Sequence, residues 1–297
     1  MGAIMILHDH LLRATANGVR AFVAVTTNLA EEARQRHNCF PVAAAALGRT
    51  MTGALLLAAN LKTDENISIR IDGDGPLGSI VADAWSDGKV RGYVEEPQID
   101  LPLHNGKLAV GQAVGKGNIY VTRFTGLKQP FTGSASLISG EIAEDITNYL
   151  YISEQTPSTI SLGVLVNPDL TVAAAGGLMV QALPGADDVI LSQIESNLTA
   201  LGPISQLIQQ GLDGEAILRK IFDGLEVNLY DSTELVFCCS CSRERVTNVL
   251  ISLGVEELAD IAKDGQAELC CHFCAQKYHF DKTELEELIE SVKKQEA

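Results

Sequence analysis

The chain carries the stretch CSC at residues 239–241 and, after a gap of 29 residues, the stretch CHFC at residues 271–274. Each stretch supplies a pair of cysteines, Cys239 with Cys241 and Cys271 with Cys274. Two such pairs give the four soft ligands that a tetrahedral zinc ion requires. The intervening segment is expected to be helical and to bring the pairs together, so the sequence predicts a small zinc-binding module near the C-terminus.

The spacing of the first pair leaves the ligand choice open. A single serine separates Cys239 from Cys241, whereas paired cysteines of structural zinc sites are usually two to four residues apart. Cys238 with Cys241 would restore the common spacing, and Cys270 also directly precedes a ligand candidate. A pair as close as Cys239 and Cys241 can also form a disulfide. Two interpretations remain: the zinc stabilises a module of about 60 residues that is too small to fold reliably alone, or it forms part of a switch.

Composition restricts the class of protein. With 297 residues, 46% of them hydrophobic, the chain suits one large and one small domain, or two domains, with a folded core. Its net charge of −16 repels nucleic-acid phosphates and anionic lipid, so we expect neither a nucleic-acid nor a membrane partner. From Asp231 onward the chain has 14 acidic and 7 basic residues, and this acidic excess also disfavours an RNA-binding zinc ribbon.

Two features of the N-terminal part predict a cytoplasmic protein. Residues 1–20 place Asp9 between two histidines where an export signal would need an apolar core. The apolar run at residues 42–60 is interrupted by Arg49, threonines and glycines, so it is expected to be a buried, alanine-rich helix. In a reducing compartment the seven cysteines indicate metal or redox chemistry sooner than structural disulfides.

Residues 67–180 have the pattern of an α+β domain. Ile67, Ile69 and Ile71 alternate with polar residues, and the glycine-rich stretch that follows predicts a hairpin turn. Apolar residues at helical spacing predict a helix against the sheet at residues 138–151. Further strands are expected at residues 80–82, 90–94, 118–124 and 161–166.

Past Gly185 the pattern predicts helices without strands. Asp187 and Asp188 can cap a first helix, and a further one is expected at residues 215–222. Helices this short are marginal unless a partner covers their apolar face, so they are candidates for a conditional element. The apolar face of this element comprises Ile190, Ile194, Leu198, Leu201, Ile204 and Leu207.

Three other groups of residues could suggest binding or catalytic sites but are interpreted as structural. Gly73, Gly75 and Gly78 match the dinucleotide-binding spacing, but Pro76 and a following strand-like run indicate a turn. The group His8, Asp9 and His10 has no partner cluster nearby in sequence, so surface or satisfied core residues are expected. Cys39 is expected to be a small buried hydrophobe.

The cysteine stretches also carry a resemblance. Together with residues 237–245, FCCSCSRER, the CHFC stretch closely resembles the heat shock protein 33 family of 33 kDa chaperonins. Four further stretches resemble family segments in the family's order: DGDGPLG at 72–78, RGYV at 91–94, SGEIAED at 139–145 and GGLMVQ at 176–181.

This resemblance implies an ATP-independent holdase, not an enzyme, that is inactive when reduced and zinc-bound and active when oxidised. It implies one zinc ion per chain, with Cys239, Cys241, Cys271 and Cys274 as both metal ligands and redox-active disulfide partners. It further implies a homodimer on activation, formed through the N-terminal domain. We expect a chaperone core at residues 1–180, a helical linker at 181–234 and a zinc-dependent redox switch at 235–297.

Oxidation of the zinc thiolates is expected to release the metal and unfold the C-terminal module, so that the linker helices lose any cover it gave them. Their apolar face, from Ile190 to Leu207, is then expected to bind unfolding clients. The first rival is a thiol-disulfide oxidoreductase using Cys271 and Cys274. A thioredoxin-like site would place its cysteines at a helix start after a strand, whereas this pair follows a helical stretch near the end of the chain. The second rival is the nucleic-acid-binding zinc ribbon that the acidic balance disfavours.

Overall fold

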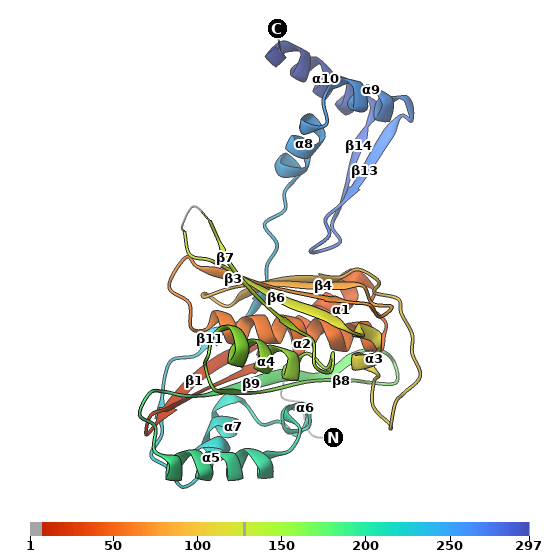
Figure 1. The fold of residues 1–297 in the computed structure, drawn as a ribbon. Coiled ribbons are helices and arrows are strands. Elements are labelled where there is room, and N and C mark those ends of the chain that lie inside the picture. Colours follow the sequence, from red (N-terminus) through yellow and green to blue (C-terminus); the bar gives the residue numbers. More distant parts are fainter. Residues whose placement is uncertain (1–7, 127–128, 297) are drawn as a thin grey trace. The chain divides into compact units, whose positions relative to one another are not determined.

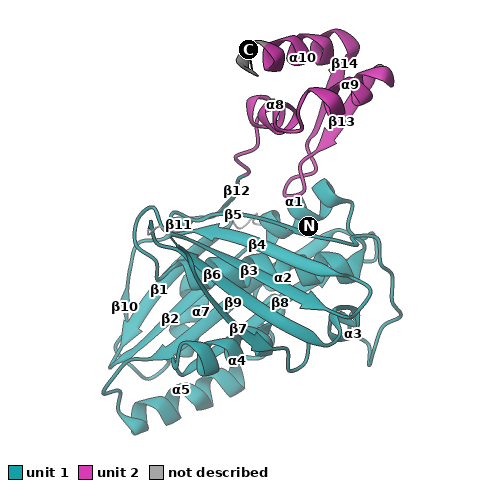
Figure 2. Cartoon of the chain, turned by 45° about the horizontal axis from the view of Figure 1, so that its top comes forward, with its two compact units in different colours: residues 1–238 teal, residues 239–297 magenta. Residues whose placement is uncertain are grey.

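The computed structural model describes residues 8–126 and 129–296. By its internal contacts the chain divides into two compact units, residues 1–238 and residues 239–297 (Figure 2). Both units mix helices and strands, as expected for an α+β protein. The helices of the predicted linker lie within the first unit, whereas the four cysteines of the predicted zinc site lie in the second.

Unit 1, residues 1–238, contains two six-stranded sheets (Figure 1). Sheet A has the order β10-β1-β2-β9-β8, and β11 also pairs with β1; its strands are β1 (His10–Ala16), β2 (Val19–Val25), β8 (Ser158–Val166), β9 (Val172–Ala182), β10 (Asn228–Leu229) and β11 (Thr233–Glu234). Sheet B has the order β12-β5-β4-β3-β6-β7, from β3 (Asn66–Gly73), β4 (Ser79–Trp85), β5 (Lys89–Val94), β6 (Gly117–Phe124), β7 (Phe131–Ser136) and β12 (Val236–Phe237). Neighbouring strands are antiparallel except β12 and β5, which are parallel.

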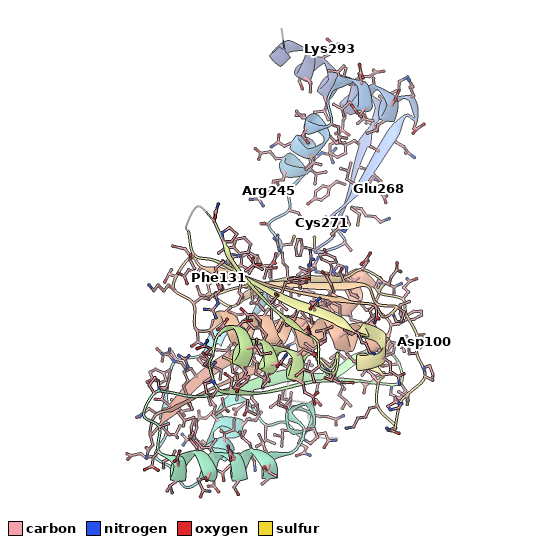
Figure 3. The ribbon with its side chains drawn as sticks, viewed as in Figure 1. Asp100, Phe131, Arg245, Glu268, Cys271 and Lys293 are labelled. Carbon is pink, nitrogen blue, oxygen red and sulfur yellow. The ribbon has the colours of Figure 1, made fainter. Side chains whose placement is uncertain are left out.

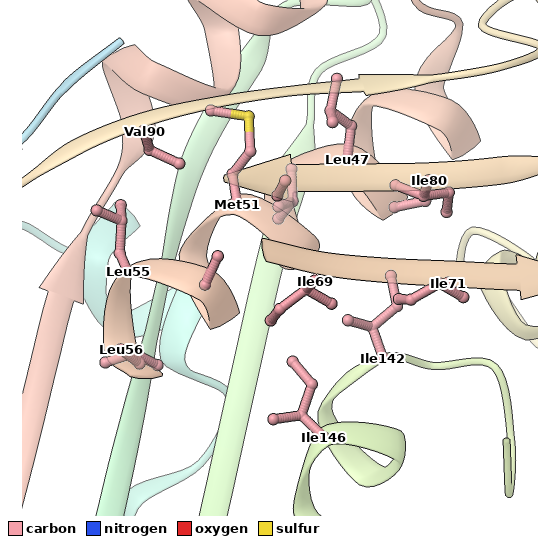
Figure 4. Packing of buried hydrophobic residues seen from close by; sticks show 14 of the residues in the cluster. Leu47, Met51, Leu55, Leu56, Ile69, Ile71, Ile80, Val90, Ile142 and Ile146 are labelled. Carbon is pink, nitrogen blue, oxygen red and sulfur yellow. The ribbon is translucent and has the colours of Figure 1, made fainter. Parts of the chain in front are cut away.

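The helix α2 (Pro41–Ala58) lies between the two sheets (Figure 1). Pro41 is the first residue of the helix, a position where the backbone N–H has no partner within the helix, so proline loses no hydrogen bond there. The helix is long and apolar enough to cross a membrane, with a mean hydropathy of 1.3, but 89% of its length is buried inside the structure. The prediction of a buried, alanine-rich helix is therefore confirmed. Leu47, Met51 and Leu55 pack with the isoleucines of β3 and β4 (Figure 4).

Three further helices complete this core: α1 (Thr27–His37), α3 (Val110–Val114) and α4 (Ala143–Ser153). The buried Asp145 orders the loop before α4, because its carboxylate accepts backbone hydrogen bonds from Ile138, Ser139, Gly140 and Ile142 at 2.7–3.3 Å. The helix predicted at residues 138–151 is thus present but begins five residues later, because this stretch forms a capped loop instead.

The helices α5 (Asp188–Leu201), α6 (Ile204–Gln209) and α7 (Gly214–Ile221) form a second core with sheet A. Asp187 caps α5 as predicted, since its side chain accepts a 2.8 Å hydrogen bond from the Val189 N–H. The expectation that no strand follows Gly185 is wrong. The strands β10 and β11 pair with β1, and β12 pairs with β5, so the segment 228–237 joins both sheets.

The stretch at residues 72–78 forms the end of β3 and the hairpin turn after it, as predicted, because β3 and β4 are antiparallel neighbours joined by residues 74–78. Its backbone lies against the end of α3, where the Gly75 N–H donates to the Val114 oxygen at 3.0 Å. A Cβ on Gly73 would overlap that same carbonyl, so the glycine is required by close packing.

Unit 2, residues 239–297, comprises α8 (Arg243–Ser252), α9 (Val255–Lys263), the hairpin β13 (Gln266–Cys270) and β14 (Lys277–Asp281), and α10 (Lys282–Glu296). Its core is small. The buried apolar side chains are Leu250, Leu258, Ala262, Phe280, Leu285, Ile289 and Val292. A core of this size leaves the unit dependent on other stabilising interactions.

Candidate metal centre

Cys239 and Cys241 lie in the segment that joins β12 to α8. Ser242 ends this segment by capping α8, with its hydroxyl accepting a 3.2 Å hydrogen bond from the Arg245 N–H. The Arg245 guanidinium also donates a 2.8 Å hydrogen bond to the hydroxyl of Ser240. This bond restrains Ser240, the residue between the two cysteines. The start of α8 thus holds both sulfurs in place.

Cys271 and Cys274 lie in the turn between β13 and β14. Figure 3 shows Cys271 at the tip of this hairpin. Two backbone hydrogen bonds close this turn: the Cys271 N–H donates to Gln276 at 2.9 Å, and the Ala275 N–H donates to Cys271 at 2.8 Å. Ala275 adopts a left-handed conformation, with φ of 55°. This tight loop directs both sulfurs toward the same point.

The four sulfurs form one cluster. The Sγ atoms of Cys239, Cys241, Cys271 and Cys274 lie within 4.8 Å of one another, and all four thiols are free. The distance from Cys239 to Cys271 is 3.7 Å, and that from Cys241 to Cys274 is 3.3 Å. A tetrahedral zinc ion with Zn–S bonds of ~2.3 Å needs sulfurs about 3.8 Å apart, so the cluster fits such an ion.

Burial and hydrogen bonding shift the pKa values of these thiols in opposite directions. Burial raises the pKa of Cys241, but hydrogen bonds from Tyr278 and the neighbouring cysteines outweigh it and lower the pKa below the ordinary thiol value. Burial raises the pKa of Cys271 and of Cys274. The hydrogen bond to Cys241 raises the pKa of Tyr278 to about 12. Cys241 is therefore the ligand candidate whose thiolate is favoured by its surroundings.

Cys238 and Cys270 stand outside the cluster. Cys238 continues β12 beside β5, and its N–H donates to the Val90 oxygen at 2.8 Å, so it belongs to unit 1. Cys270 is exposed at the end of β13, opposite Lys277. Among the described residues, the group of His, Cys, Asp and Glu side chains able to hold a metal is the four-cysteine cluster.

The other polar candidates have structural partners. The Asp9 carboxylate receives the N–H groups of Asn28 and Leu29 at 3.1 and 2.6 Å, which satisfies the first turn of α1. The His10 ring accepts a 3.1 Å hydrogen bond from the Gly214 N–H. Cys39 is 2% exposed, and burial raises its pKa to about 12, so it is the inert apolar residue that was expected.

The six side chains expected to bind clients lie against sheet A. Ile194 and Ile204 are buried, whereas the other four are partly buried and pack on the same core: Ile190, Leu198, Leu201 and Leu207. Within unit 1 their cover is provided by the sheet. Sequence reasoning missed Tyr278 as a partner of the cluster, although its alternation with Phe280 in β14 gave a strand signal.

Comparison with known proteins gives consistent matches. The family model described as Hsp33 protein matches residues 9–281. A 33 kDa chaperonin of Desulforamulus reducens is 51% identical over 98% of this chain and 100% of its own length, and one of Geobacillus kaustophilus is 46% identical over 97% and 99%. The crystal structure of the 33 kDa chaperonin of Thermotoga maritima superposes with a TM-score of 0.91 at 37% identity, covering 97% of this chain and all of that one. The chain therefore belongs to the Hsp33 family, whose members are chaperones and not enzymes.

Proposed function

We propose that the chain is an ATP-independent holdase that oxidation of a zinc-thiolate centre switches on. The observation that carries the proposal is the cluster of four free thiols in a unit with a small apolar core. Zinc is the proposed metal because an all-sulfur, tetrahedral donor set favours it over hard cations. The ligands are Cys239, Cys241, Cys271 and Cys274, one ion per chain.

The energetic argument concerns the stability of unit 2. Bound zinc would hold the sulfurs as thiolates and supply ~10–16 kcal/mol of apparent binding free energy. A unit spanning residues 239–297 has ~3–9 kcal/mol of net stability at the usual rate per residue. Because the first quantity exceeds the second, loss of the four ligands unfolds the unit.

The chemical step is the oxidation of thiol pairs by peroxide. One sulfur of a pair attacks the peroxide, the O–O bond breaks, and a sulfenic acid forms with release of water. The second sulfur then displaces a second water, which leaves a disulfide and two fewer electrons on the protein. Two peroxide molecules therefore convert the four thiols into two disulfides, which are no longer thiolate ligands.

The clients are unfolding proteins in the cytoplasm, bound by hydrophobic contact, and the active form is a homodimer. The apolar surface includes Ile190, Ile194, Leu198, Leu201, Ile204 and Leu207. These side chains become available when α5 and α6 leave sheet A. In this proposal residues 1–180 form the chaperone core, residues 181–234 form the linker and residues 235–297 form the redox switch.

The test measures zinc content and aggregation of citrate synthase in parallel, on reduced protein and on protein treated with peroxide at elevated temperature. We expect one zinc per chain, lost as suppression of aggregation appears. Retention of zinc, or its loss without chaperone activity, would refute the switch. Insulin reduction is measured on the same samples, because turnover there would favour a thiol-disulfide oxidoreductase.

A further inference from the structure

The helix α10 completes the core of unit 2. Among the described residues of this unit seven apolar side chains are buried, and α10 contributes three of them, Leu285, Ile289 and Val292. Their spacing places them on one face of the helix, which packs against α9 and β14. The helix follows residue 281, where the match to the family model ends. Nearly half of the small apolar core of unit 2 thus comes from a helix that this match does not cover.

The side chain of Arg243 joins α10 to the segments that carry the cysteines. Arg243 is the first residue of α8 and lies two residues after Cys241. Its guanidinium donates a 2.6 Å hydrogen bond to the Glu284 carboxylate of α10 and a 2.9 Å hydrogen bond to the His279 oxygen of β14. It also lies 4.3 Å from the centre of the Phe280 ring. Because β14 leaves the turn that holds the other two cysteines, one guanidinium contacts α10 and the hairpin while belonging to α8.

The position of Arg243 is unfavourable for α8 taken alone. A cation in the first turn of a helix opposes the helix dipole, and acidic residues are preferred there. Glu284 is favourably placed in the first turn of α10, where it exchanges hydrogen bonds of 2.9 and 3.0 Å with Asp281 in a capping box. One oxygen of its carboxylate caps α10, and the other accepts from Arg243. The contacts with α10 and β14 therefore explain the arginine, whereas the stability of α8 does not.

We infer that Arg243 and Glu284 are positioning residues of the metal centre. Their ion pair fixes the start of α10 to the start of α8 and to β14, and so holds the two pairs of cysteines together. The helix α10 thereby sets how tightly unit 2 holds its metal and how much oxidant opens it. Both side chains are about half exposed, at 48% and 42%, so salt weakens the pair. The inference rests on the proposed zinc switch and adds a control of its threshold.

The test measures the zinc affinity of the full-length reduced chain by competition with a chromophoric chelator. Zinc binds the folded unit, so a loss of folding stability lowers the apparent affinity. Glu284→Gln removes the charge but keeps an oxygen that can cap α10, and it should raise the Kd for zinc about three- to fivefold at low salt. High salt should bring the Kd of the wild type toward that of the variant.

A matched control is Glu286→Gln, which removes a charge from the same helix. Glu286 pairs with Lys282 inside α10, at 3.9 Å, and not with α8. This variant should change the Kd for zinc less than about twofold. Equal Kd values for Glu284→Gln and Glu286→Gln would overturn the inference.

Charge exchange separates the pairing of the two residues from their separate effects on each helix. Glu284→Arg should weaken zinc binding more than Glu284→Gln does, because it places two cations together. Adding Arg243→Glu should restore part of the lost affinity, since the pair forms again with opposite polarity. Independent structural roles predict that the two changes add, so additive losses of affinity would contradict the pairing.

The apolar contact of α10 is tested at Ile289, which is 9% exposed. Ile289→Ala should raise the Kd for zinc more than about tenfold and should speed hydrogen exchange in residues 239–281. Val249→Ala, at a residue of α8 that is 55% exposed, should leave both quantities unchanged. Unchanged exchange and affinity in Ile289→Ala would show that α10 does not support the metal centre.

The two proposals fail separately. Zinc affinity of the reduced chain tests the role of α10, and aggregation assays on the oxidised chain test the holdase switch. If peroxide switches the wild type on but Glu284→Gln binds zinc as tightly as the wild type, the holdase stands and the inference about α10 is wrong. If the zinc affinities change as expected but the oxidised chain never suppresses aggregation, the proposed function is wrong and the role of α10 stands.

Discussion

The phenol oxygen of Tyr278 lies 3.2 Å from the sulfur of Cys241 and donates a hydrogen bond to it. The two residues come from different elements, since Tyr278 belongs to β14 and Cys241 precedes α8. The bond therefore couples the position of one ligand candidate to the hairpin that carries Cys271 and Cys274. Groups that orient metal ligands in this way commonly change metal affinity by 10–100-fold when they are removed.

Replacing Tyr278 by phenylalanine should weaken zinc binding by about tenfold, because the Cys241 thiolate loses a donor and its fixed orientation. Competition with a chromophoric chelator measures the change. Tyr230→Phe is the matched control, since that hydroxyl pairs with Thr15 at 3.2 Å in unit 1. Unchanged affinity in Tyr278→Phe would show that the hairpin alone orients the cluster.

Adjacent cysteines offer a test of the ligand set. Cys239→Ser should reduce zinc content from one per chain to nearly none, because a hydroxyl is a poor replacement for a thiolate. Cys238→Ser should keep the metal, since Cys238 pairs with β5 outside the cluster. Metal analysis of the two purified variants decides the matter, and zinc loss from the Cys238 variant would instead support the two-residue spacing with Cys241.

Asp9 makes the stability of unit 1 depend on pH. Burial raises its pKa from 3.8 to about 6, so the folded state holds a proton that the unfolded state has released between about pH 4 and pH 6. The contribution of Asp9 to stability is therefore greatest below pH 4 and falls by up to ~3 kcal/mol as the pH rises through 6.

Asp9→Asn cannot titrate, so its stability relative to wild type should improve as the pH rises from 4 to 7. Urea unfolding followed by the fluorescence of Trp85, the single tryptophan of the chain and a residue of unit 1, measures this difference. The same stability difference between the two proteins at both pH values would contradict the assignment.

The core of unit 2 should set the threshold of the proposed switch. Leu258 is fully buried there, and Leu258→Ala should cost ~2–5 kcal/mol, a large part of the unit's own stability. Chaperone activity should then appear at lower peroxide concentration or temperature. Leu253→Ala, at a residue 43% exposed, should leave the threshold unchanged. Hydrogen exchange of residues 239–297 reports the loss of stability independently of activity.

Local sequence patterns predicted the elements whose own residues show how they are buried. The isoleucines of β3 alternate because only one face of that strand meets α2, and the alanine-rich run is apolar all round because α2 is enclosed. The β1–β2 hairpin was missed, although Asn17-Gly18 between two apolar runs is a strong hairpin signal. Both residues have positive φ, as such a two-residue turn requires.

Long-range pairing explains what could not be predicted. The strands β10, β11 and β12 have two residues each, too few to show a period, and they exist because β1 and β5 offer them partners. The four cysteines could be expected to cluster from their types and spacing. Which of Cys238 and Cys239 joins the cluster depends on the pairing of β12 with β5, far away in the sequence.

The segment 228–237 also determines where the chain can be shortened. A protein ending at Cys238 keeps every strand of sheets A and B, whereas one ending at Val227 loses β10, β11 and β12. The shorter product would leave β1 and β5 as bare edges, and unpaired edges promote association between molecules. The eleven residues 228–238 thus decide whether the edge strands β1 and β5 are paired, which makes proteolysis within this segment more damaging to unit 1 than loss of all of unit 2.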